Sequence, residues 1–444
     1  MTDDSTQASK EVLINVPVLA RVEGEGALEL HIKDQTIETL QLKIFEPPRL
    51  FEKFLQDRDP QQVIDMVARI CGICPVAYQM SAVNAIEDAF AVSVSDSVWQ
   101  MRRMFMCGEW IESHALHIHL LAAPDFLGAA NAIELAQRYP DEVKRGLRLQ
   151  AIGNRLIKLF GGRSVHPVGV RVGGFFHYPS GNDLQVLREE LSRALVDAEQ
   201  LVHWLAQLKL PQETQAFISV SLHRNDHYAM NEGRIIASDG LDIDCHAYED
   251  YFAEFQAEYS TAKHSHYRGQ PYLVGPLARL NNNAAQLHDG QREMMATIGL
   301  SLPSRNMFHS VIARAIEIHY ALDEAIRLID LLLGQHLAHE NDALNVEVKQ
   351  NGSVTGIGVS EAPRGILWHK YLFDTQGRVQ TANIIPPTSQ NQARIEQDLA
   401  LSLQAFGLSR TDAELRQHAE TVIRNYDPCI SCATHFLQLK TRRE

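Results

Sequence analysis

Two hydrophobic patterns divide the chain. Between Glu11 and Phe45, apolar and polar residues alternate, β-branched residues are frequent, and the polar run KDQT interrupts the pattern. Alternation with a period of two is typical of strands that bury one face, so we predict a short antiparallel sheet here. A second strand-rich segment is predicted between Asn345 and Thr381.

Most of the remaining sequence carries apolar residues at helical spacing. Asp59-Pro60 and Ser95-Asp96 are predicted helix starts, because each pairs a capping side chain with a residue that favours the first turn. Longer helices are predicted over residues 140–160, 183–208, 303–338 and 412–426. Residues 211–302 are predicted to form short strands and loops, including the polar run RLNNNAAQLHDG. The pattern predicts one mostly α-helical domain with small β-sheets (α+β) over residues 1–444.

Charge and composition argue against several classes of function. The 41 basic and 55 acidic residues give a net charge of −14, and the acidic residues are dispersed. A surface of this kind does not favour phosphate backbones, so no nucleic-acid partner is expected. The first residues, MTDDSTQASKEVLINV, lack the basic and apolar regions of a secretory signal, and no run reaches the roughly 20 apolar residues of a membrane helix. A cytoplasmic protein without a membrane partner is expected.

Four of the six cysteines form two Cys-x-x-Cys pairs, Cys71/Cys74 and Cys429/Cys432. If the pairs meet, four thiolates converge, which suits zinc, copper(I), an iron-sulfur cluster, or nickel with iron. From the pairs alone, structural zinc is the favoured interpretation. The pairs of a zinc ribbon, however, lie within a few tens of residues of each other, whereas these are separated by most of the chain.

Four motifs occur in the order and relative positions found in the large subunit of nickel-iron hydrogenases. They are RVEG at 21–24, RICGICP at 69–75, EAPRG at 361–365 and DPCISCATH at 427–435. The chain therefore resembles this family. The resemblance implies the family's fold, with a central helical bundle, and reversible heterolytic cleavage of H2.

The resemblance also implies a ligand set. Cys71 and Cys429 match terminal thiolate ligands of nickel, and Cys74 and Cys432 match thiolates that bridge nickel to an iron carrying one CO and two CN ligands. Cys429 is in addition expected to exchange a proton with a carboxylate. Thiolates donate enough charge to make nickel redox-active.

Further site residues follow from the same resemblance. Arg364 matches an arginine over the open side of the centre, where a fixed cation polarises H2. Glu23 matches a carboxylate that relays protons from Cys429, although Glu25 is equally available in VEGEG. Pro387 and Thr388 resemble a segment that packs the CO and hydrogen-bonds a CN, with plain loop packing as the alternative.

A magnesium site is implied near the centre. Glu52, the carbonyl of Ile384 and His435 match its protein ligands, with water completing the shell. On its own, Glu52 would be interpreted as a solvated helix residue.

Family members are matured by an endopeptidase that removes a tail after the histidine of the last motif. Residues 436–444, FLQLKTRRE, match such a tail. No iron-sulfur cysteine run or dinucleotide motif occurs in the chain, so electrons must leave through partners. An iron-sulfur small subunit and diaphorase subunits that bind FAD and NAD or NADP are expected.

One departure indicates the branch of the family. Tyr78 stands where many members have a histidine, and the texts RVEGEG and CGICPVAY resemble the soluble, pyridine-nucleotide-linked branch, including sulfhydrogenase α subunits. The alternatives are an H2-sensing regulator, a non-catalytic relative of the quinone-site subunit of respiratory complex I, and a zinc-bound scaffold.

The remaining candidates receive structural interpretations. Cys107 is expected to be buried, and Cys245 has no second cysteine beside it. His114, His117 and His119 do not share a metal-binding spacing and are expected to serve packing and hydrogen bonding. His166 is assigned no role.

Overall fold

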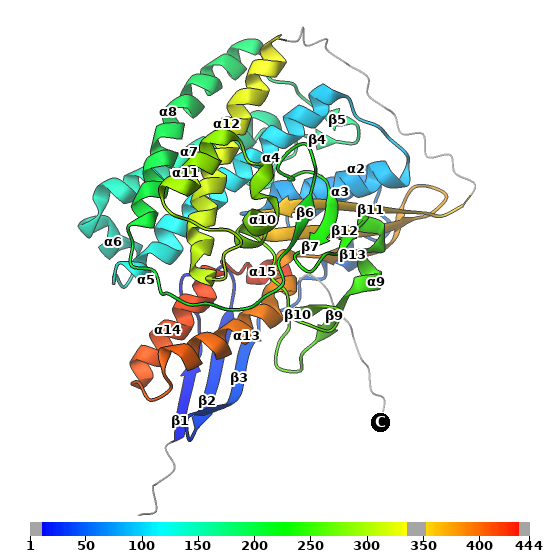
Figure 1. The fold of residues 1–444 in the computed structure, drawn as a ribbon. Coiled ribbons are helices and arrows are strands. Elements are labelled where there is room, and N and C mark those ends of the chain that lie inside the picture. Colours follow the sequence, from blue (N-terminus) through cyan, green and yellow to red (C-terminus); the bar gives the residue numbers. More distant parts are fainter. Residues whose placement is uncertain (1–10, 335–351, 435–444) are drawn as a thin grey trace, which may run out of the picture.

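The computed structural model describes residues 11–334 and 352–434 (Figure 1). Four long helices pack side by side as a bundle: α4 (Asp96–Leu116), α7 (Pro140–Gly161), α8 (Gly181–Ala206) and α12 (Ser310–Gly334). The bundle, surrounded by small antiparallel sheets, confirms the predicted mostly helical class.

The predicted N-terminal sheet is confirmed. It contains β1 (Glu11–Val16), β2 (Gly26–Lys33) and β3 (Thr36–Ile44), paired antiparallel in that order. In β1 every second residue is buried, which is the alternation seen in the sequence. The sheet contacts α13 (Pro387–Phe406) and α14 (Asp412–Asn425), which lie beside it in Figure 1.

Both predicted helix starts are confirmed by their caps. The Asp59 side chain accepts a hydrogen bond from the Gln62 N–H at the start of α2 (Pro60–Val67), and Ser95 caps α4 in the same way. The helix predicted from residue 303 begins only at Ser310, because the Asn306 side chain caps a 3-10 turn, η4 (Met307–His309). Its predicted end, beyond residue 334, lies outside the described residues.

The predicted second strand-rich segment forms a sheet of β11 (Val354–Ala362), β12 (Gly365–Phe373) and β13 (Val379–Ile385). Helix α3 (Pro75–Ala89) lies directly against β11. A Cβ atom at Gly358 would stand 2.2 Å from the Ser81 carbonyl oxygen, so only glycine permits this approach. The close contact joins the first cysteine pair's helix to the strand that ends in the EAPRG motif.

The sequence prediction missed helices in two regions. Within residues 211–302, helix α10 (Pro276–Asn283) includes the letters RLNNN that open the run predicted to be irregular. Its asparagines hydrogen-bond β6 (Val220–His223), where Asn282 and Asn283 both donate to the Ser221 hydroxyl. Helix α13 was not predicted, because its buried face carries polar side chains that have partners only in the folded chain.

The other elements are short. The helices and helical turns are α1 (Phe51–Phe54), η1 (His117–Ala122), α5 (Ala123–Phe126), α6 (Ala132–Arg138), η2 (Cys245–Ala247), α9 (Tyr248–Tyr251), η3 (Ala284–Gln286), α11 (Asp289–Thr297) and α15 (Ile430–Ala433). The strands are β4 (Val170–Arg171), β5 (Gly174–Phe175), β7 (Arg234–Ala237), β8 (Asp242–Ile243), β9 (Phe252–Gln256) and β10 (Lys263–Tyr267).

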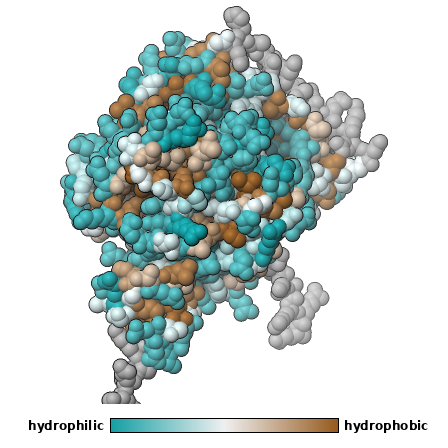
Figure 2. Space-filling view, viewed as in Figure 1, coloured by the Kyte–Doolittle hydropathy of each residue, from teal (hydrophilic) through white to brown (hydrophobic). Residues whose placement is uncertain are grey.

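The visible surface is mixed in polarity. Figure 2 shows hydrophilic residues over most of the face, with apolar residues interspersed among them. Within residues 11–334 and 352–434, no helix has both the length and the apolar content that crossing a membrane requires.

Candidate metal centre

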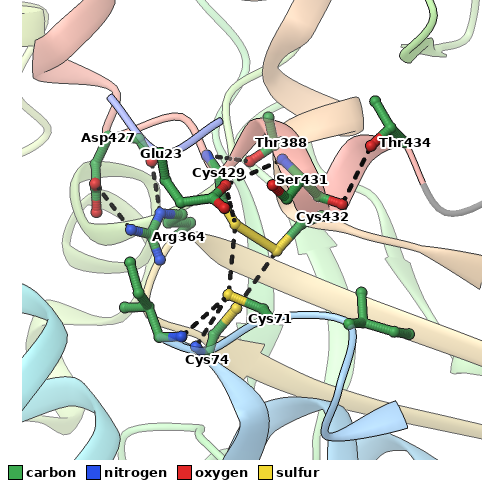
Figure 3. The surroundings of a disulfide bond; sticks show 12 residues. Glu23, Cys71, Cys74, Arg364, Thr388, Asp427, Cys429, Ser431, Cys432 and Thr434 are labelled. Atoms are coloured by element: carbon green, nitrogen blue, oxygen red, sulfur yellow. Dashed lines mark hydrogen bonds and ion pairs between the residues drawn. A yellow bond between two sulfur atoms is a disulfide. The ribbon is translucent and has the colours of Figure 1, made fainter. Parts of the chain in front are cut away.

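The two cysteine pairs meet in the interior of the protein. Cys74 precedes the first turn of α3, and Cys429 precedes the short helix α15 that contains Cys432. The four Sγ atoms lie within 4.8 Å of one another, and each cysteine is at most 3% exposed (Figure 3). The Cys71 and Cys429 sulfurs are 3.5 Å apart, and those of Cys74 and Cys432 are 3.6 Å apart. The fold thus brings together all four predicted metal ligands.

In this structure Cys429 and Cys432 form a disulfide (Figure 3). A metal ion requires the thiolate form of both residues, so the centre can be assembled only on the reduced pair. The other two cysteines, Cys71 and Cys74, are free thiols that face this pair.

The surroundings of the sulfurs favour the thiolate form of Cys71. Cys71 Sγ accepts hydrogen bonds from the backbone N–H groups of Ile73 and Cys74, both at 3.3 Å. A hydrogen bond from the Cys74 side chain, opposed by burial and helped by the charge of Arg364, lowers the pKa of the Cys71 thiol. The pKa of Cys74 is raised well above its ordinary value by the same hydrogen bond and by burial. Buried sulfurs cannot all ionise without compensating charge, which soft metal cations would supply.

Arg364 lies over the sulfurs and is held by one residue of the last motif. Its Nε donates to the Asp427 carbonyl oxygen at 2.6 Å, and its Nη2 donates to Asp427 Oδ1 at 2.9 Å. The third nitrogen, Nη1, is buried and has no hydrogen-bond partner among the described residues. An unpaired donor beside four cysteines fits an acceptor group carried by a metal, as the cyanide ligands of the predicted centre would be.

Glu23 contacts the second cysteine pair directly. Its Oε2 lies 3.2 Å from Cys429 Sγ and accepts a hydrogen bond from the Ser431 N–H at 3.0 Å. The Glu23 carbonyl also accepts from the Ile430 N–H. Gly24 permits this approach, because it has a φ of +87° and a Cβ there would stand 2.7 Å from Ile430 Cβ. The neighbouring Glu25 is exposed, so the geometry favours Glu23 of the two candidate carboxylates.

Arg49 links the two cysteine loops, a role that the sequence did not reveal. Its Nη2 donates to the carbonyl of Ile70, one residue before the first pair, and to the carbonyl of Ser431, inside the second pair. Its backbone N–H donates to the carbonyl of Thr434 at 2.7 Å. One guanidinium therefore fixes the distance between segments that are far apart in the sequence.

The remaining predicted site residues lie nearby. Thr388 Oγ1 accepts from the Cys429 N–H at 3.0 Å, and Pro387 precedes it in the first turn of α13. That bond occupies the threonine oxygen and leaves its hydrogen to donate. At the predicted magnesium site, Glu52 Oε1 accepts from the Ile384 N–H at 2.8 Å, so two of the three predicted ligand residues are adjacent. The third, His435, lies outside the described residues, as does the predicted tail 436–444.

The three neighbouring histidines are buried and hydrogen-bonded, as their structural interpretation requires. His114, His117 and His119 hydrogen-bond three different partners: Glu317, the Arg424 carbonyl and the Ala115 carbonyl. Cys107 is fully buried.

Tyr78, which replaces a common histidine, is 1% exposed, and its hydroxyl has no partner among the described residues. It therefore makes no hydrogen bond to a thiolate in this structure.

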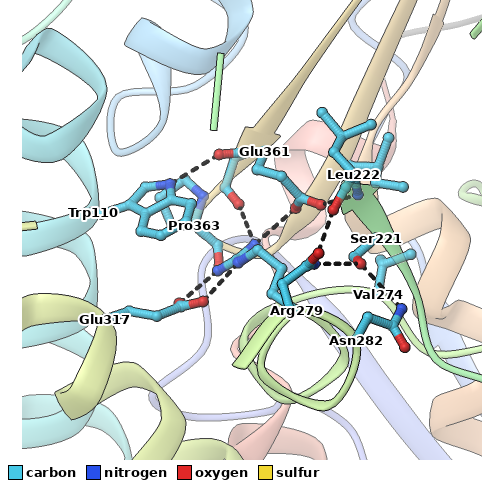
Figure 4. Close-up of polar contacts among 12 residues, drawn as sticks. Trp110, Ser221, Leu222, Val274, Arg279, Asn282, Glu317, Glu361 and Pro363 are labelled. Atoms are coloured by element: carbon cyan, nitrogen blue, oxygen red, sulfur yellow. Dashed lines mark hydrogen bonds and ion pairs between the residues drawn. The ribbon is translucent and has the colours of Figure 1, made fainter. Parts of the chain in front are cut away.

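In the interior, a buried arginine joins three elements (Figure 4). Arg279 donates from Nε and Nη2 to the two oxygens of Glu317, both at 2.7 Å, and from Nη1 to Glu361 Oε2 at 2.9 Å. Its guanidinium also stacks over Trp110. Burial raises the pKa of Glu361 to about 7, although the charge of Arg279 opposes this. Because Glu361 begins the EAPRG motif, the network fixes the strand end that leads to Arg364.

Comparisons with known proteins agree with this arrangement. A family model described as nickel-dependent hydrogenase matches residues 49–145 and 223–435. The chain is 34% identical to sulfhydrogenase 2 subunit alpha of Pyrococcus furiosus, over 96% of this chain and 100% of that protein. It is 27% identical to NAD-reducing hydrogenase HoxS subunit beta of Cupriavidus necator, over 97% of this chain and 95% of that protein. A solved NAD+-reducing NiFe hydrogenase in the H2-reduced state superposes with a TM-score of 0.84 at 26% identity, over 96% of this chain and 99% of that chain. The predicted fold is confirmed.

Leaving Arg364 without its partner Asp427 should destabilise the fold, because a buried charge would remain unpaired. In Asp427→Asn the buried guanidinium loses its compensating charge, and we expect the free energy of unfolding to fall by about 3 kcal/mol. Chemical denaturation of the purified chain measures the change. The matched control is Asp330→Asn, which breaks a pair with Arg188 whose side chains are 49% and 40% exposed and should cost less than about 1 kcal/mol. Equal losses in the two variants would contradict the assigned role.

Glu361 should make stability depend on pH. Its pKa rises from 4.5 in the unfolded chain to about 7 in the fold, so between these values the folded state keeps a proton that the unfolded state has lost. Stability should therefore fall as pH rises from 4.5 to 7, by on the order of 3 kcal/mol. We expect Glu361→Gln to be less stable throughout but to lack this slope. Unfolding curves at pH 5 and pH 7 for both proteins give the comparison, and an unchanged slope would contradict it.

Proposed function

The chain belongs to the nickel-dependent hydrogenase family, and we propose that it passes the electrons of H2 through an iron-sulfur small subunit to NAD or NADP. It is the large, catalytic subunit of such an enzyme, an oxidoreductase, and the family's centre contains nickel and iron. The observation that carries the proposal is the convergence of Cys71, Cys74, Cys429 and Cys432 within 4.8 Å.

We assign the cysteine roles from the family motifs. Cys71 and Cys429, whose sulfurs are 3.5 Å apart, would be terminal ligands of nickel, and Cys74 and Cys432, 3.6 Å apart, would hold both nickel and iron. When bound, nickel and iron would supply the chemistry for heterolytic cleavage of H2. A buried, closed set of thiolates excludes water from the site and holds both metals at fixed separation.

Glu23 would accept the proton released at Cys429. Its Oε2 lies 3.2 Å from Cys429 Sγ, which is within reach for direct transfer. Glu23 is partly exposed, and the Ser431 beside it hydrogen-bonds Glu46 at 2.7 Å. We therefore place the route for protons to solvent on this side of the cysteine loop.

Arg364, Pro387 and Thr388 would surround the diatomic ligands of the iron. The unpaired Nη1 of Arg364 and the hydroxyl hydrogen of Thr388 are donors suited to two cyanides, while Pro387 presents an apolar ring suited to the CO. Arg364 also keeps a positive charge beside the sulfurs, where it would polarise H2. Asp427 acts through Arg364 by fixing its orientation.

A magnesium ion near the centre is part of the proposal. Glu52, the Ile384 carbonyl and His435 would bind it, and the short contact between Glu52 and the Ile384 backbone supports the first two. Hard oxygen ligands and retained water are what magnesium prefers.

The electron acceptor of the complex is inferred from the names of the relatives. One is named an NAD-reducing hydrogenase subunit and another a sulfhydrogenase alpha subunit, which supports a complex with small and diaphorase subunits that carry iron-sulfur clusters and FAD. Reduction of pyridine nucleotides would place the complex in the cytoplasm. We further propose that a maturation endopeptidase removes residues 436–444 once nickel is bound.

Proton relay is tested by Glu23→Gln. The amide cannot accept and release a proton, so we expect H2/D+ exchange to be abolished while nickel and iron content stays normal. Glu25→Gln, the same change two residues away on an exposed side chain, serves as the control and should retain exchange. Normal exchange in the Glu23 variant would overturn the assignment.

The centre itself is tested by infrared spectroscopy of the native complex together with metal analysis. We expect one CO band and two CN bands that shift under H2, with about one nickel per chain, as four thiolates require. Zinc in place of nickel, without these bands, would reduce the chain to a zinc-bound relative of the enzymes.

A further inference from the structure

A second cluster of metal-binding side chains lies at the far end of α3. Asp244, Cys245 and His246 are consecutive, and their ligand atoms lie within 4.8 Å of one another. Cys245 Sγ is 3.7 Å from Asp244 Oδ1 and 3.7 Å from His246 Nδ1. Asp88, near the end of α3, adds a carboxylate 3.0 Å from His246 Nε2. Sequence reasoning found only a lone cysteine here, because Asp88 is remote in the chain.

We propose that this cluster is a divalent metal site of the zinc class, with Asp244, Cys245 and His246 Nδ1 as ligands and Asp88 as the residue that positions the histidine. A thiolate, an imidazole and a carboxylate form a mixed donor set typical of Zn2+. The site does not involve the nickel-iron centre, and the inference does not rest on the proposed function.

The distances suit a tetrahedral ion. With metal-sulfur and metal-nitrogen bonds of about 2.3 and 2.0 Å, the sulfur and nitrogen of two ligands stand roughly 3.6 Å apart, and Cys245 Sγ and His246 Nδ1 are 3.7 Å apart. His246 Nδ1 and Asp244 Oδ1, at 2.5 Å, would open by less than about 1 Å to admit the metal. The Asp244 side chain is 61% exposed, so rotation about its own bonds allows that change.

The two carboxylate contacts of His246 require either a protonated ring or a bound metal ion. A neutral imidazole carries one N–H, yet carboxylate oxygens face both ring nitrogens of His246, at 2.5 and 3.0 Å. Either a second ring proton or a metal at Nδ1 resolves this arrangement. With the proton on Nε2 and donated to Asp88, the Nδ1 lone pair faces Cys245 and Asp244, which is the carboxylate–histidine–metal arrangement of zinc proteins.

The cluster is anchored to two strands of the second sheet. Asp88 Oδ2 also accepts from the Ile357 N–H of β11 at 2.9 Å. The Cys245 carbonyl accepts from Trp368 Nε1 of β12 at 3.0 Å. The cysteine, the histidine and Asp88 line a surface cavity of about 550 Å³, which leaves room for a water as fourth ligand. The anchored backbone holds the cysteine and the histidine in place. The open cavity gives an ion from solution a path to them.

The experiment uses the purified mature complex, dialysed against a chelator and titrated with Zn2+ or Co2+. We expect one additional ion per chain, with a thiolate-to-cobalt charge-transfer absorption. Cys245→Ser and His246→Gln should weaken binding at least about 100-fold, and Asp88→Asn about 10- to 100-fold, as loss of an outer-sphere partner does. Asp250→Asn removes an exposed charge close in the same segment and should leave binding unchanged.

Two results would overturn the proposal. One is a titration in which no additional ion binds or the charge-transfer band is missing, because Cys245 would then not be a metal ligand. The other is binding that Cys245→Ser and Asp250→Asn affect equally, which would place the ion elsewhere. H2 oxidation by each variant, with its circular dichroism spectrum, checks that the fold is intact.

Discussion

The convergence of four sulfurs from opposite ends of the chain is the constraint on which the rest of the structure depends. Cys71 and Cys429 are 358 positions apart in sequence and 3.5 Å apart in space. Arg49 donates hydrogen bonds to both cysteine loops, and a backbone bond from Ile430 to Glu23 ties the second loop to the N-terminal segment. The N-terminal sheet, the bundle and the last helix are arranged so that these short segments meet.

Bringing charged groups into this interior costs solvation, and the fold offsets that cost with paired ions. Arg364 is paired with Asp427 beside the sulfurs. Arg279 is paired with Glu317 and Glu361 elsewhere in the interior. Each arginine joins elements that no local interaction would hold together. These ion pairs therefore fix where the EAPRG end of β11 lies more than they stabilise the fold.

How much of this the sequence could predict depends on the range of the interaction. Period-two alternation predicted β1 to β3, and side-chain caps predicted the starts of α2 and α4, because both signals are local. The motifs singled out the four cysteines and Glu23, and the fold brings these residues together. Helix α13 and the asparagine run in α10 could not be predicted, since their buried polar residues have partners only in the folded chain. Arg49 and Asp88 were missed for the same reason.

The helix α3 connects the two clusters. It begins at the first cysteine pair, with Cys74 as its N-cap, and Asp88 at its other end reaches His246. Between these ends it lies against β11 at Gly358, so neither end can move without disturbing the strand that leads to Arg364. A divalent ion at Asp244, Cys245 and His246 would tie the surface segment to Asp88 and hence to this helix. Because the ligands lie outside the buried centre, such an ion would restrain the scaffold of the active site without entering its chemistry.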